Sequence, residues 1–498
     1  MPSFSESSLS SLKDTIIMFI TISPQSNYQI WGILMPYYFS YLKHFNPEIT
    51  FNQIFASSCF FYLGILFCSW CYPSMVSVLG LNNLTRLSGT LYAVNAVAMN
   101  TFSSFEMVCV SIGVIGFCIK IMFVNNMLYF TCKYKENATK LIGIANFGYI
   151  ALSFIWSYLY FYFINPGNET MTEIAYNGTT EERYFKWEIA QRFQFTLNLH
   201  GLSCFIISMI CSFLITDPEK YKSNIDKLWA WITNKDRKAW ESIWKERTSI
   251  DVSFSNKSNS KVGFDSFNKS HNDSNNSDKL IELLANTETK IVDKDAIDEI
   301  VQQELRKPKF WILLLVSILK LILVYYMIDM NKILGLIILK DDKLITQAFN
   351  VISISLGIFY SFIIFTLDRI GFMNGYIISS VIVILTEIYF MFFTKEFPLL
   401  FVVFLFFSIF NLAFIEQINN LILIHFYSPE VTLQLQKIFD FNLFIANVIV
   451  VLCNTFLFKQ NDLFPIFSCY LIFDVIGLIL TVVYLRPTKK RDNEDEVD

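Results

Sequence analysis

Several ionisable side chains lie inside long apolar stretches of this sequence. Lys120, Lys320 and Glu416 are the clearest examples. An ionisable group at membrane depth is costly and usually faces a cavity or a partner. A lysine in an aqueous cavity is a compact point charge that could attract a carboxylate, and a desolvated Glu416 could carry a proton. These residue types predict a binding site for a small organic anion, with Glu416 as the coupling group.

Uncharged polar residues nearby could complete such a site. Asn27 and Tyr28 follow Pro24, which frees a backbone carbonyl, and Asn411 precedes Glu416 by five residues. The alternative interpretation is structural, because a lysine that pairs with Glu416 would hold two helices together.

Other embedded charges favour structural interpretations. Lys120 could extend its ammonium group to the membrane interface. Lys437 and Asp440 are three residues apart, which predicts a local pair on one helix. Glu387 and Asp474 are expected on peripheral helices, where hydrogen bonds between packed helices are their predicted role.

The composition is that of a membrane protein. Of the 498 residues, 54% are hydrophobic and only 16% are charged, where a soluble domain carries roughly 25% charged residues. This excludes an ordinary soluble enzyme and a disordered chain. The net charge of −4 gives no indication of a nucleic-acid partner. The sequence contains no P-loop, zinc-ligand motif or nucleophile elbow, so we expect neither an enzyme nor a bound metal or cofactor.

Twelve stretches are long enough to span a bilayer as helices. They predict an all-α membrane protein of two six-helix halves, residues 1–216 and 309–486, with an insert at 217–308 between them and a charged tail at 487–498. The predicted spans are 15–42, 52–72, 87–104, 106–129, 140–164, 193–216, 309–329, 344–366, 372–394, 397–424, 433–458 and 463–486.

The polar segments predict how the chain lies in its membrane. Within the insert we expect an amphipathic helix at 224–248, a disordered tract at 253–278 and one or two helices at 279–306. Twelve spans place both termini and the insert on the same side of the membrane. This side has a modest excess of Lys and Arg, which favours a cytoplasmic location for it. The sequons at Asn168 and Asn177 fall in the largest loop on the opposite side. The membrane itself is either the plasma membrane or that of an organelle.

A short loop pattern occurs once in each half. Asp368, Arg369 and Gly371 follow the eighth span as Asp-Arg-Ile-Gly, and Gly80 ends the corresponding loop after the second span, where Ser and Val replace Asp and Arg. The pattern resembles the G-x-x-x-D-R-x-G loop of the major facilitator superfamily. The resemblance implies the major facilitator fold, with gating by these four residues and a cavity lined by the first, fourth, seventh and tenth helices.

Further stretches narrow the resemblance. Residues 28–37 read Tyr-Gln-Ile-Trp-Gly-Ile-Leu-Met-Pro-Tyr, residues 46–47 are Asn-Pro, and residues 305–311 read Leu-Arg-Lys-Pro-Lys-Phe-Trp. They are similar to the oxalate–formate antiporter and monocarboxylate transporter branch. This similarity implies alternating access, by proton coupling or by exchange.

Three hypotheses for function follow. The first is secondary transport of a mono- or dicarboxylate, bound by Lys320, Lys120, Asn27, Tyr28 and Asn411. The second is transport of a neutral or zwitterionic solute, such as an amino acid or a nucleoside, with Lys320 as an ion-pair partner. The third is a non-transporting sensor or accessory subunit, whose partners are other proteins of a membrane complex and the lipid bilayer.

Overall fold

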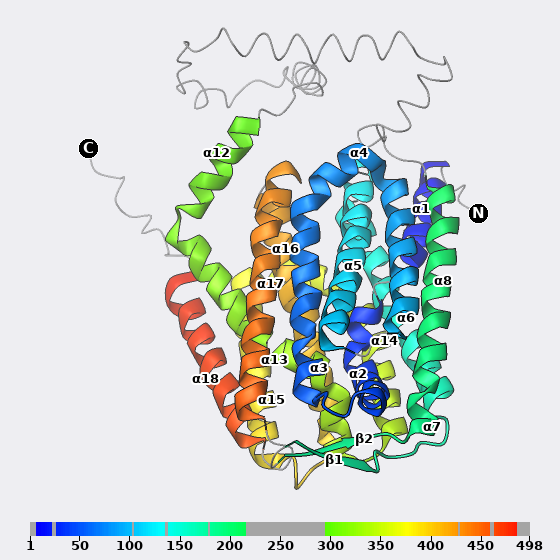
Figure 1. The fold of residues 1–498 in the computed structure, drawn as a ribbon. Coiled ribbons are helices and arrows are strands. Elements are labelled where there is room, and N and C mark those ends of the chain that lie inside the picture. The colour runs from blue at the N-terminus through cyan, green and yellow to red at the C-terminus, as the bar shows by residue number, and fades with distance from the viewer. Residues whose placement is uncertain are drawn as a thin grey trace, which may run out of the picture.

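The chain forms a bundle of long helices with one β-hairpin at an end (Figure 1). We call that end the hairpin side, and the opposite end, where α12 (Lys294–Leu305) lies, the insert side. The computed structural model describes residues 6–21, 26–101, 104–134, 138–177, 180–215, 294–426, 429–458 and 463–485.

The N-terminal half contains the first six predicted spans. Its hairpin is antiparallel, with Glu173 opposite Tyr184, and connects the fifth span to the sixth. The elements are α1 (Glu6–Thr21), α2 (Ser26–Phe45), α3 (Phe51–Ala56), α4 (Ser58–Met99), α5 (Phe105–Tyr134), α6 (Ala138–Ile164), β1 (Glu173–Asn177), β2 (Thr180–Tyr184), α7 (Trp187–Ala190) and α8 (Arg192–Leu214).

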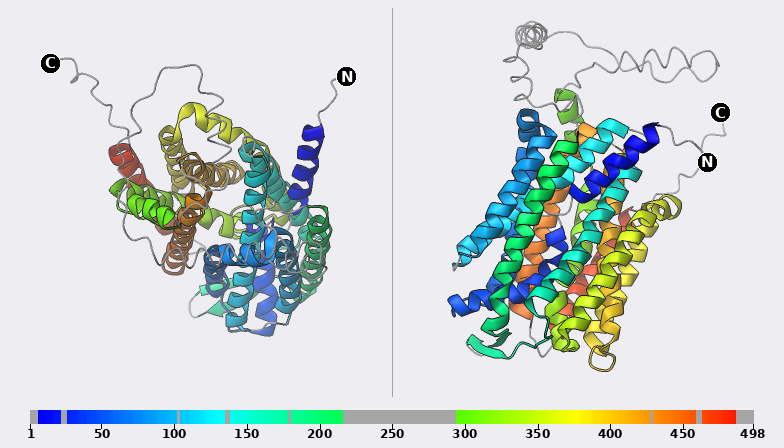
Figure 2. Two further views of the ribbon diagram at one scale, coloured as in Figure 1. Left: turned by 90° about the horizontal axis from the view of Figure 1, so that it is seen from above. Right: turned by 90° about the vertical axis from the view of Figure 1, so that its right-hand side faces the viewer.

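The C-terminal half contains the other six spans, and two of its helices end in a wider π-helical turn. Seen from the insert side, the two halves lie next to each other as separate groups of helices (Figure 2). The elements are α13 (Pro308–Ile338), α14 (Asp342–Ile370), α15 (Phe372–Ile388), η5 (Tyr389–Phe393), α16 (Leu400–Phe426), α17 (Pro429–Leu457), α18 (Phe464–Leu480) and η6 (Thr481–Leu485).

The all-α fold of twelve spans is confirmed, but one boundary was predicted wrongly. The described residues of the first predicted span belong to α1 and α2, and residues 22–25 lie outside the described residues. The predicted loop at 73–86 is helical on both sides of Gly80, where the two helices covered by the α4 range meet at a residue with non-helical φ and ψ. Val76, Leu81 and Leu84 are buried in this segment, and that burial favours helix over an exposed loop.

Parts of the insert and tail lie outside the described residues. These are the predicted amphipathic helix at 224–248, the tract at 253–278 and the tail at 487–498. At the end of the insert, α12 packs against α17, and its Val301 and Leu305 contact an apolar cluster on α13 and α17. The division into two halves and an insert stays a prediction.

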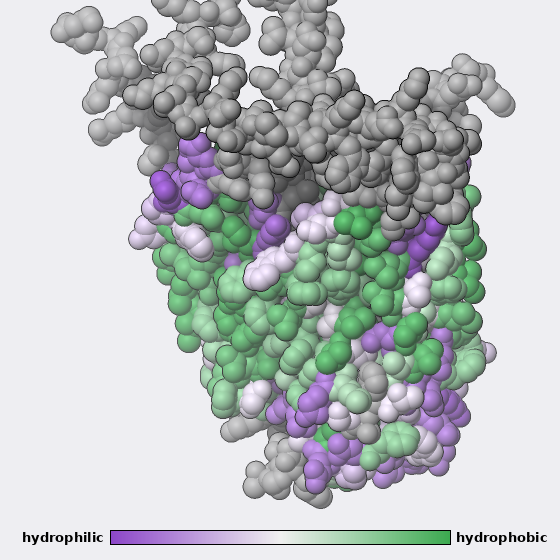
Figure 3. All heavy atoms as spheres, turned by 45° about the horizontal axis from the view of Figure 1, so that its top comes forward, coloured by the Kyte–Doolittle hydropathy of each residue, from purple (hydrophilic) through white to green (hydrophobic). Residues whose placement is uncertain are grey.

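The outer surface of the bundle is apolar around its middle (Figure 3). Phe213 and Phe456, for example, are 73% and 77% exposed. Such a continuous apolar surface is unfavourable in water and natural in lipid. Among the described residues, seven helical segments are long and apolar enough to cross a membrane, and one of them, Phe51–Met99, contains two predicted spans. The chain is an integral membrane protein.

The two loop glycines have matching backbone conformations. Gly80 has φ 76° and ψ 170°, and Gly371 has φ 82° and ψ 148°. This region of φ and ψ is essentially restricted to glycine. Each glycine lets the chain reverse from one helix into the next on the insert side, so the repeat predicted from the loop pattern is also a repeat in geometry.

Alanine at either glycine is expected to destabilise the protein by about 1–3 kcal/mol. At Gly371 a Cβ would meet nothing within 4 Å, so the whole effect comes from the backbone. Thermal unfolding of the purified protein measures it. Gly167→Ala is the control, because its Cβ would make only an ordinary contact of 3.8 Å with the Glu169 side chain and its φ is not positive. Equal melting temperatures for Gly371→Ala and the control would refute the backbone explanation.

Candidate solute-binding site and gate

The two halves pack against each other through three pairs of helices that reach the hairpin side (Figure 1). Here α2 packs against α13, α4 against α17 and α6 against α14. Aromatic side chains join the halves, since the Tyr62 and Tyr325 ring centroids are 4.9 Å apart. Ser157 on α6 also donates a hydrogen bond to the Asn350 amide on α14. The interface is therefore both apolar and hydrogen-bonded.

A buried ionic network, which we call the latch, connects the halves on this side. It consists of Tyr37 on α2, Asn165 after α6, Lys332 on α13 and Asp342 on α14. The Lys332 Nζ lies 2.7 Å from the Asp342 Oδ1, and both side chains are 0% exposed. The Tyr37 hydroxyl and the Asn165 amide donate to the Asp342 Oδ2 at 2.8 and 2.7 Å. The Lys332 Nζ also donates to the Tyr37 hydroxyl at 2.8 Å. The latch closes the hairpin side with partners from both halves.

The hairpin and a nearby loop reinforce this closure. The Lys43 Nζ on α2 lies 3.2 Å from the Glu182 Oε2 on β2, and the Phe51 amide donates to the Glu182 Oε1 at 2.8 Å. The Asn168 Nδ2 donates to the Asp341 Oδ1 at 3.1 Å. The first two contacts attach the hairpin to its own half, and the third crosses to the other half.

Gly32 permits the close approach of α2 and α13. A Cβ at this position would lie 1.9 Å from the Ile328 carbonyl oxygen and 2.9 Å from the Asn331 Nδ2. Neither the backbone nor a packed amide can yield by that amount, so any larger side chain must push the helices apart.

We therefore expect Gly32→Ala to weaken the closed interface by about 1–3 kcal/mol. Thermal unfolding measures the loss. Gly113→Ala is a graded comparison, because its Cβ would meet the Phe60 carbonyl oxygen at 3.3 Å, where a small adjustment suffices. If Gly32→Ala were as stable as Gly113→Ala, the close approach would not be essential.

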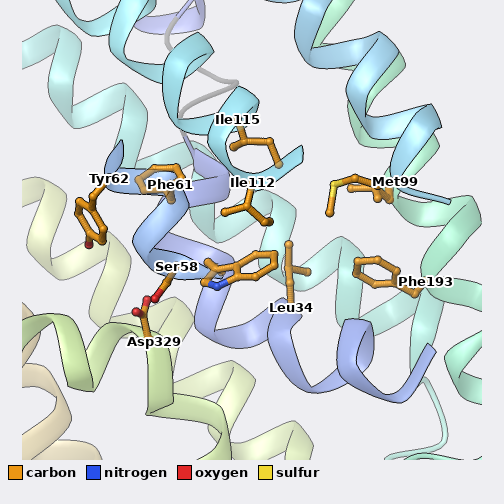
Figure 4. Close-up of a pocket in the computed structure, with 11 residues that line it drawn as sticks. Leu34, Ser58, Phe61, Tyr62, Met99, Ile112, Ile115, Phe193 and Asp329 are labelled. Carbon is orange, nitrogen blue, oxygen red and sulfur yellow. The ribbon is translucent and has the colours of Figure 1, made fainter. Parts of the chain in front are cut away.

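A narrow cavity of about 20 Å³ lies next to the closed interface (Figure 4). Most of its lining is apolar or aromatic. The Trp31 Nε1 is buried without a hydrogen-bond partner among the described residues, so it is available to a ligand. The lining residues are Trp31, Leu34, Ser58, Phe61, Tyr62, Met99, Ile112, Ile115, Phe193, Leu197 and Asp329.

Asp329 is the ionisable residue of this cavity. It extends from α13 of the C-terminal half, while the other lining residues belong to the N-terminal half. The carboxylate is 1% exposed and accepts a hydrogen bond from the Asn447 Nδ2 at 3.5 Å. Ser58 points toward it (Figure 4). Among the described residues no cation lies within ion-pair distance of Asp329. A buried carboxylate without a cation attracts hydrogen-bond donors or a positive group.

Lys120 and Asp440 form a second ion pair between the halves. The Lys120 Nζ on α5 lies 2.8 Å from the Asp440 Oδ2 on α17, and Ser69 on α4 donates to the same oxygen at 2.5 Å. The predicted local pair of Lys437 and Asp440 is therefore wrong. The Lys437 Nζ donates to the Gln434 Oε1 at 2.8 Å, because Asp440 faces the other half.

Lys320 lies inside the C-terminal half. Its Nζ is 3.0 Å from the Asp474 Oδ1 on α18, and both side chains are at most 1% exposed. Lys320 is absent from the cavity lining. The structure thus gives both predicted anion-binding lysines an aspartate partner that the sequence did not assign to them. The Glu416 side chain lies outside the described residues, so the alternative pairing of a lysine with Glu416 stays a prediction.

The arrangement of the helices was compared with solved structures. A xylose transporter, XylE from E. coli, in a partially occluded inward open conformation, has a TM-score of 0.58 at 9% identity over 95% of this chain and 100% of that chain. The nucleoside transporter NupG has a TM-score of 0.57 at 13% identity, over 95% and 98%. The peptide transporter POT has a TM-score of 0.60 at 10% identity, over 94% of each chain.

This chain has the major facilitator fold. No family model matches its sequence, and no curated protein is similar to it in sequence. The similarity extends over nearly the whole of each chain, so both halves of the fold are present. These similarities do not distinguish branches of the fold, so the predicted oxalate–formate and monocarboxylate branch stays a prediction.

For several of the predicted binding and gating residues, the structure gives the position of the backbone only. Asn27 and Tyr28 lie on α2, Glu416 on α16, and Asp368 and Arg369 at the end of α14, but their side chains lie outside the described residues. Their predicted roles stay predictions.

Asn411 is different, because its side chain is described. It is 1% exposed, and neither amide atom has a hydrogen-bond partner among the described residues. It does not line the cavity. A buried amide without partners could bind water or a ligand, so its predicted role in binding is untested.

The sequence patterns missed Asp329 and the latch. The predicted seventh span ended at residue 329, so Lys332 was assigned to a loop, whereas α13 continues to Ile338. Tyr37 fell within the first predicted span, and Asp342 fell in the loop before the eighth. The available signal was the apolar Ile-Leu-Gly-Leu-Ile-Ile stretch after Lys332, which continues the helix. Among the described residues, no group of three His, Cys, Asp or Glu side chains could hold a metal ion.

Proposed function

We propose that this chain is a secondary transporter that moves a small neutral or zwitterionic solute by alternating access. The observation that carries the proposal is the cavity between the halves, where Asp329 of one half faces aromatic side chains of the other. In a two-half transporter the substrate binds at the interface of the halves near the bilayer midplane. The rise per residue of an α-helix places Trp31 on the order of 20 Å from the end of α2 that lies on the hairpin side.

The chemistry of the cavity favours a solute with hydrogen-bond donors. Asp329 can accept from hydroxyl or ammonium groups, and the Trp31 Nε1 can donate to a carbonyl or hydroxyl oxygen. The aromatic lining offers faces to a ring or an ammonium group. Similar structures named for transport of xylose, nucleosides and peptides support this solute class.

An organic anion is the second candidate. The sequence favoured it because of Lys120 and Lys320, but each of these ammonium groups is already paired with an aspartate. A carboxylate would therefore have to displace Asp440 or Asp474, and in the cavity it would face the like charge of Asp329. Both effects oppose binding.

Alternating access is supported by the distribution of polar contacts. The latch and the Asn168–Asp341 contact close the hairpin side. To open this side, the halves must separate there and expose the latch residues to water. We propose that α2 and α13, which carry Tyr37 and Lys332, are the helices that separate.

Uptake into proteoliposomes tests the proposal. The panel contains radiolabelled sugars, nucleosides, amino acids, short peptides and mono- and dicarboxylates, and protein-free liposomes give the background. We expect saturable uptake of at least one neutral or zwitterionic solute. Uptake of carboxylates alone would favour the anion hypothesis. No uptake of any solute by folded protein would favour a non-transporting accessory role.

A further inference from the structure

Three ionisable side chains meet inside the C-terminal half, away from the cavity. They are Lys320 on α13, Glu387 on α15 and Asp474 on α18, which we call the buried triad. Their exposed fractions are 0%, 0% and 1%. The function proposed above does not use them.

The contacts within the triad connect all three residues. The Lys320 Nζ donates to the Asp474 Oδ1 at 3.0 Å and to the Asp474 backbone carbonyl at 3.2 Å. The Glu387 carboxyl group is a neighbour of Asp474. No other donor among the described residues reaches the two Glu387 carboxyl oxygens or the Asp474 Oδ2.

The charges of the triad balance only when it holds a proton. Two carboxylates and one ammonium carry a net charge of −1, which is strongly unfavourable in a water-free interior. Two ionised carboxylates also cannot form a hydrogen bond, because neither has a donor. If Glu387 is protonated, its O–H donates to the Asp474 Oδ2 and the net charge becomes zero. This arrangement leaves no buried charge without a partner.

We propose that the buried triad is a proton-binding site that couples solute transport to a proton gradient. The proposal rests on the transport function argued above and assigns its coupling ion. Glu387 takes a proton from water on one side of the membrane and releases it on the other, so the triad alternates between net charges of 0 and −1. Asp474 and Lys320 position the carboxyl group.

Neutral groups surround the triad. Among the described residues, the titratable side chains that face it are Cys469 and Tyr470 on α18. Cys453 on α17 lies beyond Cys469, with its Sγ 4.0 Å away, and Tyr326 on α13 lies beside Tyr470. Thiols and phenols are uncharged near neutral pH, so Glu387 is the group of this cluster that can exchange a proton.

The triad residues lie on or next to elements that would move when the latch opens. Glu387 lies two residues before the π-helical turn η5, and wider turns of this kind frequently occur at functional sites. Helix α13 carries Lys320 of the triad, Asp329 of the cavity and Lys332 of the latch. A shift of α13 that opens the latch would therefore also move the ammonium group of the triad.

Infrared difference spectroscopy tests proton binding without transport. Purified wild-type protein is compared with Glu387→Gln and with Glu396→Gln, an exposed glutamate close in sequence. Glutamine keeps the size of the side chain and donates to Asp474, so the fold is expected to survive. We expect a protonated-carboxyl band at neutral pH that is absent from Glu387→Gln and present in Glu396→Gln. An identical band in all three proteins would overturn the proposal.

Transport measurements test the coupling. A gradient of one pH unit supports at most about a ten-fold accumulation for one proton per solute. We expect this accumulation in the wild type and its loss in Glu387→Gln, while exchange of labelled for unlabelled solute continues. Accumulation by Glu387→Gln equal to that of the wild type would overturn the coupling role. If the wild type takes up no solute but shows the band, the transport proposal fails while the proton site stands.

Discussion

Asp342→Asn is expected to open the hairpin side of the protein. In the closed state Lys332 is 0% exposed, and Asp342 is its ion-pair partner at 2.7 Å. Removing one partner of a buried pair typically costs about 3–5 kcal/mol, which corresponds to a change of roughly 150- to 5,000-fold in an equilibrium constant. When the halves separate, water reaches Lys332, so the cost falls on the closed state alone. The equilibrium between the two states therefore shifts toward the open state.

The reaction of an introduced cysteine measures this shift. Ser157 lies at the interface of α6 and α14 and is buried, so Ser157→Cys, in a background without native cysteines, reports separation of the halves. We expect a membrane-impermeant thiol reagent added on the hairpin side to react much faster in the Asp342→Asn variant. Solute uptake should fall at the same time, because the protein no longer closes on that side.

Two variants check this interpretation. Asp341→Asn removes the neighbouring, half-buried carboxylate, whose contacts are exposed to water, so we expect a change of less than about five-fold. The double variant Lys332→Met with Asp342→Leu removes both charges and should restore slow labelling, because an apolar pair can replace a buried ion pair. Fast labelling of the double variant would show that the ion pair is not what holds the hairpin side closed.

Asp329→Asn is expected to weaken solute binding by about 10- to 100-fold. A hydrogen bond to a charged group contributes about 1.5–3 kcal/mol, and Asp329 is the carboxylate of the cavity lining. Asparagine has nearly the same volume and keeps an acceptor for Asn447, so the cavity retains its shape. The loss should appear in the apparent affinity for the transported solute, measured by competition for uptake.

Further variants distinguish a direct loss of solute binding from an effect on folding. Trp31→Phe keeps an aromatic face but removes the Nε1 donor, so we expect a smaller loss of affinity, of about two- to ten-fold. Glu106→Gln, at an exposed position at the start of α5, should change nothing. Unchanged affinity in Asp329→Asn, with folded protein, would remove the cavity from the proposed binding site.

These two predictions are linked through α13. Asp329 and Lys332 are separated by less than one turn of the same helix. A solute that binds Asp329 therefore acts beside the residue that closes the hairpin side. This proximity gives a physical route by which solute binding could change the relative stability of the open and closed states, since a ligand shifts such an equilibrium only through differential contacts.

The sequence by itself determined the helices and their number. A spanning helix is recognised from about 20 consecutive apolar residues, and this signal is local, so twelve spans could be predicted without knowledge of their packing. The loop pattern around Gly80 and Gly371 is also a local signal. Both residues have a positive φ in the structure, which glycine adopts readily. Errors occurred at polar residues near predicted helix ends, as at Lys332.

Only the tertiary structure decided which buried charges are paired and which face the cavity. Lys120 and Asp440 are 320 residues apart, and Tyr37 and Asp342 are 305 residues apart, so no spacing in the sequence indicates either contact. The energy of a buried charge depends on its partner and on the exclusion of water. Both are set by the packing of distant helices. For this reason Lys320, which could bind a solute by its residue type, lies in the buried triad, and Asp329 lies in the cavity.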